Sequence, residues 1–340
     1  MINYLFKANL YLKAKASVKQ GKLNAQTLSA MSASLTPLDN NASKWLQYAL
    51  LQRSITGEVD EPTLQHLQTV DILKQSKASA VRLLNLLPPI RREEFLSKKA
   101  KQQQTLANAS PLIASSLVKI NTEGLSENTR RLAMIHDLQS AWRDDFFSYL
   151  QGKHIAIVGN AGSIKGTHYG NHIDEHQVVC RFNSFSTSNT NDLGQRIDVW
   201  VTSPDMLNKR LSLPNNLKWI VISGPDVRYT LLNWEGAINY QLKGCKILTL
   251  PLAVWNELVS ILEAPPSAGI ALLKWLISER QFSDTLSIFG FDYDNVNTKH
   301  YHARSSKLQA GKRHAWVKEK NEIKRYEAGG FITLFRGNTT

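Results

Sequence analysis

Six short apolar runs in the second half of the chain constrain the fold more than any other feature of the sequence. Polar or helix-forming stretches separate them. Apolar residues on both faces of such runs are typical of strands in a mostly parallel sheet that helices cover. Residues 151–340 are therefore predicted to form an α/β domain. The runs are Ile155–Val158, Val178–Phe182, Val199–Thr202, Trp219–Ile222, Ile247–Leu250 and Leu286–Phe289.

Residues 1–150 differ in composition, being rich in Leu, Ala, Gln, Lys and Ser. Apolar residues recur at helical spacing in Trp45–Leu50, Val81–Leu87 and Leu132–Leu150. The stretch Lys98–Ser110 is polar enough to be a mobile connection. The sequence therefore predicts an all-helical N-terminal domain over 1–150, followed by the α/β domain.

The chain is basic, with a formal net charge of +13. Such a charge indicates an anionic partner, which could be nucleic acid, an acidic membrane surface or a charged substrate. The basic residues form no aromatic-interleaved stripe and no nucleic-acid motif is present, so we expect no nucleic acid. No acidic residue precedes Asp39, whereas Lys7, Lys13, Lys15, Lys19 and Lys22 do. The opening helix either docks on the rest of its domain with its basic face in solvent, or makes a peripheral contact with an anionic membrane.

The cellular location is predicted from what the chain lacks and from its two cysteines. No stretch approaches the roughly 20 apolar residues of a membrane-spanning helix, and the N-terminus has no signal-peptide pattern. Cys180 lies inside an apolar run and Cys245 begins another, where buried free thiols are ordinary. We therefore expect a cytoplasmic protein.

The first predicted strand runs directly into a turn of small residues. Such a turn presents backbone N–H groups that can hold phosphate, and ligands of parallel sheets bind beyond the carboxyl ends of the strands. The glycine spacing fits neither the dinucleotide pattern G-x-G-x-x-G nor a P-loop. The turn therefore predicts a nucleotide site that is not specific to NAD or ATP. Its residues are Gly159, Asn160, Ala161, Gly162 and Ser163.

Four groups of residues between Lys153 and Gly330 follow one another in a recognisable order. The first is Val158, Gly159, Asn160, Ala161, Gly162, Ile164, Gly166, Asp174, His176, Arg181 and Asn183, continued by Asp192, Leu193, Gly194, Gln195 and Arg196. The second is Pro266, Ser267, Ala268 and Gly269, closed by Ile288, Phe289, Gly290 and Phe291. The others are His300, Tyr301 and His302, and the pair His314 and Glu319. The set resembles the large, small, third and very small sialyl motifs of glycosyltransferase family 29, the animal-type sialyltransferases.

The resemblance implies a Rossmann-like variant of the GT-A-type fold and an inverting transfer of sialic acid from CMP-sialic acid to a glycan or glycolipid hydroxyl. Ser267 is expected to cap a helix whose N-terminus suits a phosphate. Asn160 and Asn183 are either hydrogen-bonding partners of the nucleotide or turn-forming residues. The implied donor contacts are Gly159, Asn160, Gly162, Ser163, Asn183, Ser267, Ala268, Gly269, Gly290, Phe291 and His302.

Two histidines carry the implied chemistry. His314 is the expected general base, because a neutral imidazole can take a proton and the N-terminus of the predicted helix 315–328 would lower its pKa. His300 is expected to stabilise the departing CMP phosphate, with His302 as its local competitor. Glu319, five residues after His314, would point about 140° away from it on one helix, which predicts a structural role.

Three alternatives stay open. Asp292, Tyr293 and Asp294 form an Asp-x-Asp that can hold a divalent cation, whereas the resemblance implies a reaction without metal or other cofactor. Animal sialyltransferases have an N-terminal membrane anchor and a disulfide that joins the large and small motifs. This sequence shows no such anchor and has Ile155 in the place of the first cysteine, which indicates a bacterial relative at the inner membrane face. There CMP-Kdo (3-deoxy-manno-octulosonate) is a second candidate donor. The third alternative is a non-catalytic protein that binds nucleotide-sugar or nucleic acid, and the N-terminal domain would bind acceptor, membrane or partner.

Overall fold

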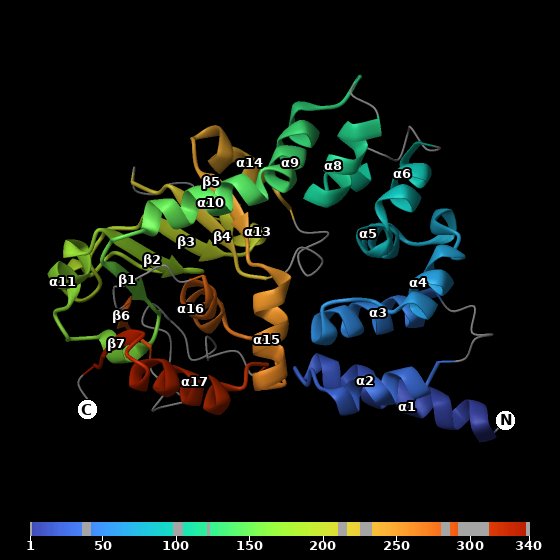
Figure 1. Ribbon diagram of the computed structural model, residues 1–340, viewed down its shortest axis with the longest axis horizontal. Helices are drawn as coiled ribbons and strands as arrows, with labels where there is room; N and C mark the ends of the chain where they lie inside the picture. The colour runs from blue at the N-terminus through green and yellow to red at the C-terminus, as the bar shows by residue number, and fades with distance from the viewer. Residues whose placement is uncertain are drawn as a thin grey trace. The chain divides into compact units, whose positions relative to one another are not determined.

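The structure is a computed structural model and describes residues 2–35, 42–97, 105–120, 123–209, 216–224, 233–279, 286–291 and 313–337 (Figure 1). The chain divides into two compact units. The helical unit comprises Met1–Leu138, Gly224–Ile238 and Pro251–Pro265. The sheet unit comprises Gln139–Ser223, Asn239–Leu250 and Pro266–Thr340.

The helical unit confirms the predicted all-helical N-terminal region. Asn24, Asp60, Ser76 and Ser126 each cap a helix by accepting a hydrogen bond from the backbone N–H three residues later. Among the described residues, no helix is both long and apolar enough to cross a bilayer. The elements are α1 (Ile2–Lys19), α2 (Ala25–Ala33), α3 (Ala42–Thr56), α4 (Glu61–Gln68), η1 (Ile72–Lys74), α5 (Lys77–Leu86), α6 (Pro89–Ser97), α8 (Pro111–Ile120), α9 (Glu127–Asp137) and α15 (Leu252–Leu262).

The division falls elsewhere than at residue 150, and side-chain contacts explain the difference. Helix α15 packs in the helical unit, where Asn256 donates hydrogen bonds to the carbonyls of Arg53 and Ser54 at 3.1 and 2.8 Å. Helix α10 (Gln139–Leu150) packs in the sheet unit instead. There the Gln139 amide donates to the Ile247 carbonyl and accepts from the Thr249 N–H, both at 2.8 Å.

The sheet unit contains a seven-stranded sheet in the order β5-β4-β3-β2-β1-β6-β7, in which all neighbouring strands are parallel. The predicted α/β fold with a parallel sheet is therefore confirmed. Strand β5 begins one residue earlier than predicted, and β7 was not predicted. The strands are β1 (Ile155–Val158), β2 (Val178–Phe182), β3 (Val199–Thr202), β4 (Trp219–Ile222), β5 (Lys246–Thr249), β6 (Leu286–Phe289) and β7 (Ile332–Phe335).

Helices cover both faces of this sheet. On one face, Phe146 of α10 packs edge-on against Trp219 of β4 and stacks on Trp275 of α16, with ring centroids 5.1 and 5.7 Å apart. On the other face, Trp200 of β3 meets Tyr240 of α14 edge-on at 5.9 Å. Both cysteines are buried and free, as predicted. The remaining elements are η2 (Gly162–Ile164), α11 (Gly170–Glu175), α12 (Thr190–Leu193), α13 (Pro204–Leu207), α14 (Glu235–Leu242), α16 (Ala268–Ser278) and α17 (Trp316–Ala328).

The strand order places a topological switch point between β1 and β6. From β1 the chain adds strands successively on one side, through β2 to β5, whereas β6 lies on the other side of β1 and is followed by β7. In open parallel sheets the crevice beyond the carboxyl ends of the strands at such a point is where ligands bind. A ligand site is therefore expected beyond the carboxyl ends of β1 and β6.

Candidate functional site

The turn after β1 is bonded to the end of β6. The Gly159 N–H donates to the Phe289 carbonyl at 2.7 Å, and the Ala161 N–H donates to the Gly290 carbonyl at 3.0 Å. A Cβ on Gly159 would lie 2.3 Å from the Gly290 oxygen, so only glycine fits there. Two N–H groups of the turn are thus used by the protein itself. Any phosphate contact by this turn falls to its other residues.

The Phe291 ring lies against two of the predicted donor-site glycines. A Cβ on Gly159 would lie 2.8 Å from the ring, and a Cβ on Gly269 would lie 2.7 Å from its far edge. The ring also packs edge-on against Phe182 at the end of β2, with centroids 6.0 Å apart. The structure therefore brings together Gly159, Gly269, Gly290 and Phe291, which are more than 100 residues apart in sequence at the extremes.

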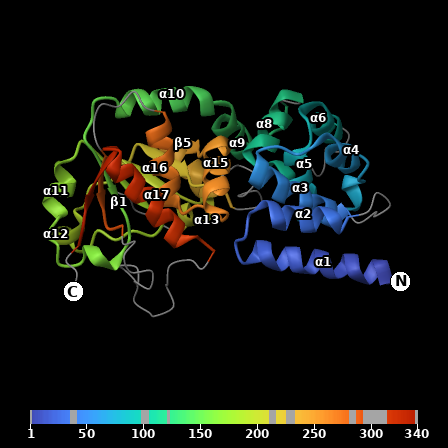
Figure 2. The same cartoon turned by 60° about the horizontal axis from the view of Figure 1, so that its bottom comes forward.

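The N-terminus of α16 is tied to α17 by a buried carboxylate. Ser267 caps α16 as predicted and accepts from the Ile270 N–H at 3.4 Å. Glu319 accepts hydrogen bonds from the Ser267 N–H at 2.8 Å and from the Ser267 hydroxyl at 2.6 Å. The two helices lie close together in both views (Figures 1 and 2). Glu319 thus accepts from both hydrogen-bond donors of Ser267. A contact between Ser267 and a CMP-sugar stays a prediction.

Glu319 is fully buried, and this burial controls its protonation. Desolvation raises the pKa of the Glu319 carboxyl to about 7, although the two hydrogen bonds from Ser267 oppose the rise. Glu319 therefore has a structural role: it anchors the first turn of α17 to the N-terminus of α16.

His314 lies just outside helix α17. The helix begins at Trp316, and Ala315 is its capping residue without a side-chain hydrogen bond. The His314 ring is half-buried and packs edge-on against Trp316 at 5.1 Å. The rotation of about 140° between His314 and Glu319 was calculated for two residues on one helix, and it does not apply because His314 precedes α17. Because Glu319 anchors the first turn of α17, it also fixes the segment that carries His314.

The two predicted donor-site asparagines serve the loop conformation. The Asn160 amide donates to the Phe182 carbonyl at 2.9 Å, which ties the turn after β1 to the end of β2. Asn183 is exposed, has a φ of 46°, and its carbonyl accepts from the Trp200 indole N–H at 2.9 Å. Asparagine tolerates this left-handed conformation better than most residues. The turn-forming alternative is thus observed for both, and their nucleotide contacts stay predictions.

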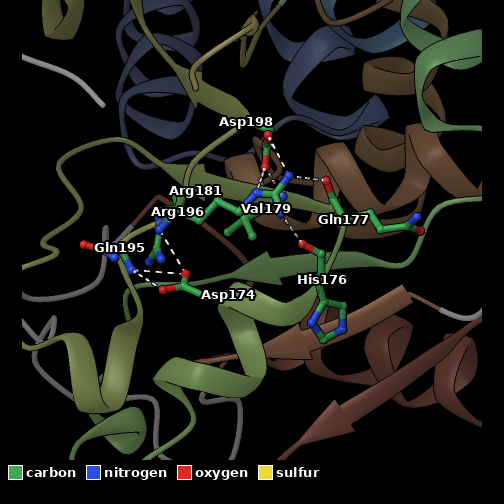
Figure 3. A network of polar contacts seen from close by, with 8 residues as sticks. All are labelled: Asp174, His176, Gln177, Val179, Arg181, Gln195, Arg196 and Asp198. Carbon is green, nitrogen blue, oxygen red and sulfur yellow. Dashed lines mark hydrogen bonds and ion pairs between the residues drawn. The ribbon is translucent and has the colours of Figure 1, made fainter. Parts of the chain in front are cut away.

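Other residues of the large-motif resemblance lie at the opposite, amino edge of the sheet, in the network of Figure 3. The Asp174 carboxylate, just before β2, accepts from the backbone N–H groups of Gln195 and Arg196 at 2.9 Å each. Arg196 pairs with buried Asp198 at 2.9 Å and donates to the carbonyls of His176 and Gln177 at 2.9 and 2.6 Å. We call these residues the amino-edge network.

Two further charged residues of the resemblance are structural. Arg181, fully buried in β2, donates to the carbonyls of Arg196 and Leu193 at 2.8 and 2.6 Å. Asp192 is buried and accepts from the N–H groups of Gly166 and His168 at 2.8 and 3.1 Å, which holds the loop that follows η2. The motif pattern includes Arg181 and Asp192 but does not predict these backbone partners.

The remaining predicted residues have the following places. Gly162 and Ser163 begin η2, and Ser163 is packed closely against Gly337, where a Cβ would lie 1.9 Å from the Ser163 oxygen. Ala268 and Gly269 open α16. His300 and His302 lie outside the described residues, as do Asp292 and Asp294.

Comparisons with known proteins support the sequence resemblance. Residues 95–232 match the family model described as Glycosyltransferase family 29 (sialyltransferase). An alpha-N-acetylneuraminide alpha-2,8-sialyltransferase of Xenopus tropicalis is 32% identical over 113 residues, which are 31% of this chain and 32% of that protein. The chain therefore spans about a third of the curated relative that it matches.

Two solved structures are similar at low identity. A mammalian sialyltransferase matches with a TM-score of 0.42 and 21% identity, over 55% of this chain and 70% of that chain. A mammalian sialyltransferase in complex with Gal-beta-1-3GalNAc-ortho-nitrophenol matches with a TM-score of 0.45 and 18% identity, over 67% and 86%. The family match covers the turn after β1 and the amino-edge network, and ends before α16 and α17. The stretch from residue 95 to residue 232 is therefore similar to glycosyltransferase family 29.

Proposed function

We propose that this chain is a sialyltransferase-type glycosyltransferase that uses a CMP-activated sugar. The observation that carries the proposal is the junction at the switch point of the sheet. There the ends of β1 and β6 and the first turn of α16 meet around the Phe291 ring. A helix N-terminus and a strand-end turn offer the backbone N–H groups and partial positive charge that a nucleotide phosphate needs. The match of residues 95–232 to the sialyltransferase family supports sialic acid as the sugar.

The proposed reaction is an inverting displacement at the anomeric carbon. The acceptor hydroxyl oxygen forms a bond to this carbon while the bond from the carbon to the CMP phosphate breaks. His314 takes the hydroxyl proton as general base. The first turn of α16, with Ala268 and Gly269, stabilises the charge that develops on the departing CMP, and His300 is proposed to assist it.

The proposal includes a reaction without metal ion. The leaving group is a monophosphate, whose charge a helix N-terminus and a histidine can balance. We further propose a glycan or glycolipid acceptor, a cytoplasmic location and a bacterial source. In that setting CMP-Kdo is the second candidate donor.

The test is CMP release by the purified full-length chain. The protein is incubated with CMP-sialic acid or CMP-Kdo, with a panel of glycan acceptors, and with or without EDTA. The proposal predicts CMP release from CMP-sialic acid that depends on acceptor and is unchanged by EDTA. CMP release from CMP-Kdo alone would make CMP-Kdo the donor in place of CMP-sialic acid. Loss of CMP release in EDTA would contradict the metal-free mechanism. No release from either donor, together with CMP binding by calorimetry, would favour the non-catalytic alternative.

A further inference from the structure

Helix α1 has one side buried in the helical unit. Tyr11 and Ala14 on this side are buried and belong to an apolar cluster with Leu23 and Met31, and Val18 packs against it. The Tyr11 hydroxyl also donates to the Gln47 amide oxygen at 2.7 Å. In both views α1 runs along the outside of the helical unit beside α2 (Figures 1 and 2). Its orientation in this unit is therefore fixed, and so is the side that faces away from the core.

The outward side of α1 combines large apolar and basic side chains. Phe6 and Leu12 are 62% and 63% exposed, and Lys13 and Lys19 are exposed as well. Lys15 is exposed at the margin of this side, where its ammonium lies 5.9 Å from the centroid of the Tyr11 ring. Phe6 and Lys13 are seven residues apart, as are Leu12 and Lys19, so each pair lies within about 20° of one line along the helix. Each exposed apolar side chain thus has a lysine in line with it, two turns further along.

The surroundings of this face carry no compensating acid from the same helices. The first acidic residue of the chain is Asp39, so α1 and α2 contain none. Three exposed lysines without acidic neighbours on these helices favour an anionic surface and disfavour a second copy of the same face. The face is therefore complementary in charge to an anionic partner.

The two exposed apolar side chains decide which anionic partner fits. Phosphates of nucleic acid, or acidic peptide side chains, satisfy lysines but leave Phe6 and Leu12 in water. A lipid bilayer accepts both, because apolar side chains enter the boundary between headgroups and acyl chains while the ammonium groups remain among anionic headgroups. We propose that α1 docks the helical unit on the surface of an anionic lipid bilayer. This proposal does not depend on the transferase activity.

The experiment is sedimentation of the full-length protein with vesicles of phosphatidylcholine alone or mixed with phosphatidylglycerol. We expect binding to the mixed vesicles only, weakened by added NaCl because surface electrostatics are screened by salt. The triple variant Lys13→Gln, Lys15→Gln, Lys19→Gln should bind roughly 100-fold more weakly, since each lysine near an anionic surface contributes about fivefold. The double variant Phe6→Ser, Leu12→Ser should lose about tenfold through its lost apolar contact.

A matched control makes three changes, as many as the triple variant, on other helices of the same unit. Ile90 is 78% exposed, and Lys74 and Lys77 are exposed, so Ile90→Ser with Lys74→Gln and Lys77→Gln removes comparable groups. This variant should bind as the unchanged protein does. All α1 positions changed are exposed, and circular dichroism checks that each variant is folded. Equal binding to both vesicle types, no binding to either, or equal losses in the control and the α1 variants would overturn the proposal. A single-stranded oligonucleotide that displaces the protein from the mixed vesicles would also overturn the proposal, if the double variant binds this oligonucleotide as tightly as the unchanged protein does.

Discussion

The amino and carboxyl edges of the sheet differ in how they use the residues between Lys153 and Gly330 that resemble the sialyl motifs. At the amino edge, charged side chains are buried or half-buried and bonded to backbone groups: Asp198 accepts from the Val179 N–H and from Arg196, and Arg196 also donates to two carbonyls. At the carboxyl edge, Gly159 and Gly269 pack against the Phe291 ring beside the switch point between β1 and β6. Residues that match the sialyl motifs therefore have different roles at the two edges of the sheet. The charged ones at the amino edge stabilise the fold, and the small ones at the carboxyl edge shape the proposed site.

The largest effect is expected from His314→Ala, which tests the carboxyl edge. Loss of a general base should reduce transfer by roughly 10²–10⁴-fold, because no positioned base then takes the proton from the attacking hydroxyl. CMP affinity should stay unchanged, and calorimetry measures it alongside CMP release. His154→Ala, an exposed histidine just before β1, is the matched control and should keep full activity. Unimpaired transfer by His314→Ala would remove His314 from the mechanism.

Arg196→Met tests the amino edge. It leaves the buried Asp198 carboxylate without its cation and two carbonyls without their donor, so the free energy of unfolding should fall by about 3 kcal/mol. Urea unfolding at pH 7 measures this loss. Arg325→Met is the control, since Arg325 is 62% exposed and pairs with Glu322 on the surface of α17, a pair worth less than about 1 kcal/mol. A loss of CMP affinity in Arg196→Met without a loss of stability would reverse the roles of the two edges.

Glu319→Gln tests whether the buried carboxylate at the carboxyl edge makes stability depend on pH. The pKa of Glu319 is raised to about 7 in the folded protein and is lower in the unfolded chain, so folding takes up a proton between about pH 4.5 and 7. Stability from this group is therefore present at low pH and lost as pH rises through that window. Relative to the unchanged protein, Glu319→Gln should gain stability across the window by no more than about 3 kcal/mol.

Urea unfolding from pH 4.5 to 8 follows this difference. Glu175→Gln, an exposed change on α11, removes one carboxylate without touching Ser267 and serves as the control. A difference between Glu319→Gln and the unchanged protein that does not vary with pH would mean that the pKa of Glu319 is the same in the folded and the unfolded chain, and would contradict the raised pKa.

The smallest effect is expected from Gly269→Ala. The new Cβ would lie 2.7 Å from the Phe291 ring, and such overpacking costs about 1–3 kcal/mol. In a Phe291→Leu background the same change should be neutral, because the ring edge is gone. Gly159→Ala should not be rescued in this way, since its Cβ also meets the Gly290 carbonyl at 2.3 Å. Thermal unfolding of the double-mutant cycle measures the coupling, and equal costs of Gly269→Ala in both backgrounds would contradict the packing.

Much of the sheet could be predicted because its strands are continuous apolar runs, and β1, β2, β3, β4 and β6 have the predicted bounds. Strand β7 was missed, although Phe331–Phe335 is a short apolar run after Gly329 and Gly330. As an edge strand it is only partly buried, and its run includes Thr333, so it stands out less. The strand order itself depends on tertiary packing that no local pattern encodes.

The local structure around the candidate site could be predicted, but its contacts could not. Glycines at strand ends and a capping serine are local signals, so the turn at Gly159 and the cap at Ser267 were predicted, whereas their binding of a nucleotide stays a prediction. That Ser267 binds Glu319, 52 residues away, follows only from how α16 and α17 pack. Likewise, nothing local distinguishes an arginine that bonds carbonyls, such as Arg196, from one that binds a ligand.

The most direct test of the division between the two edges is a crystal structure of the protein with bound CMP. We expect the nucleotide phosphate to lie beyond the carboxyl ends of β1 and β6, about 3 Å from backbone N–H groups of the turn after β1 or of the first turn of α16. A phosphate bound at the amino edge, by Arg196 and its neighbours, would contradict it.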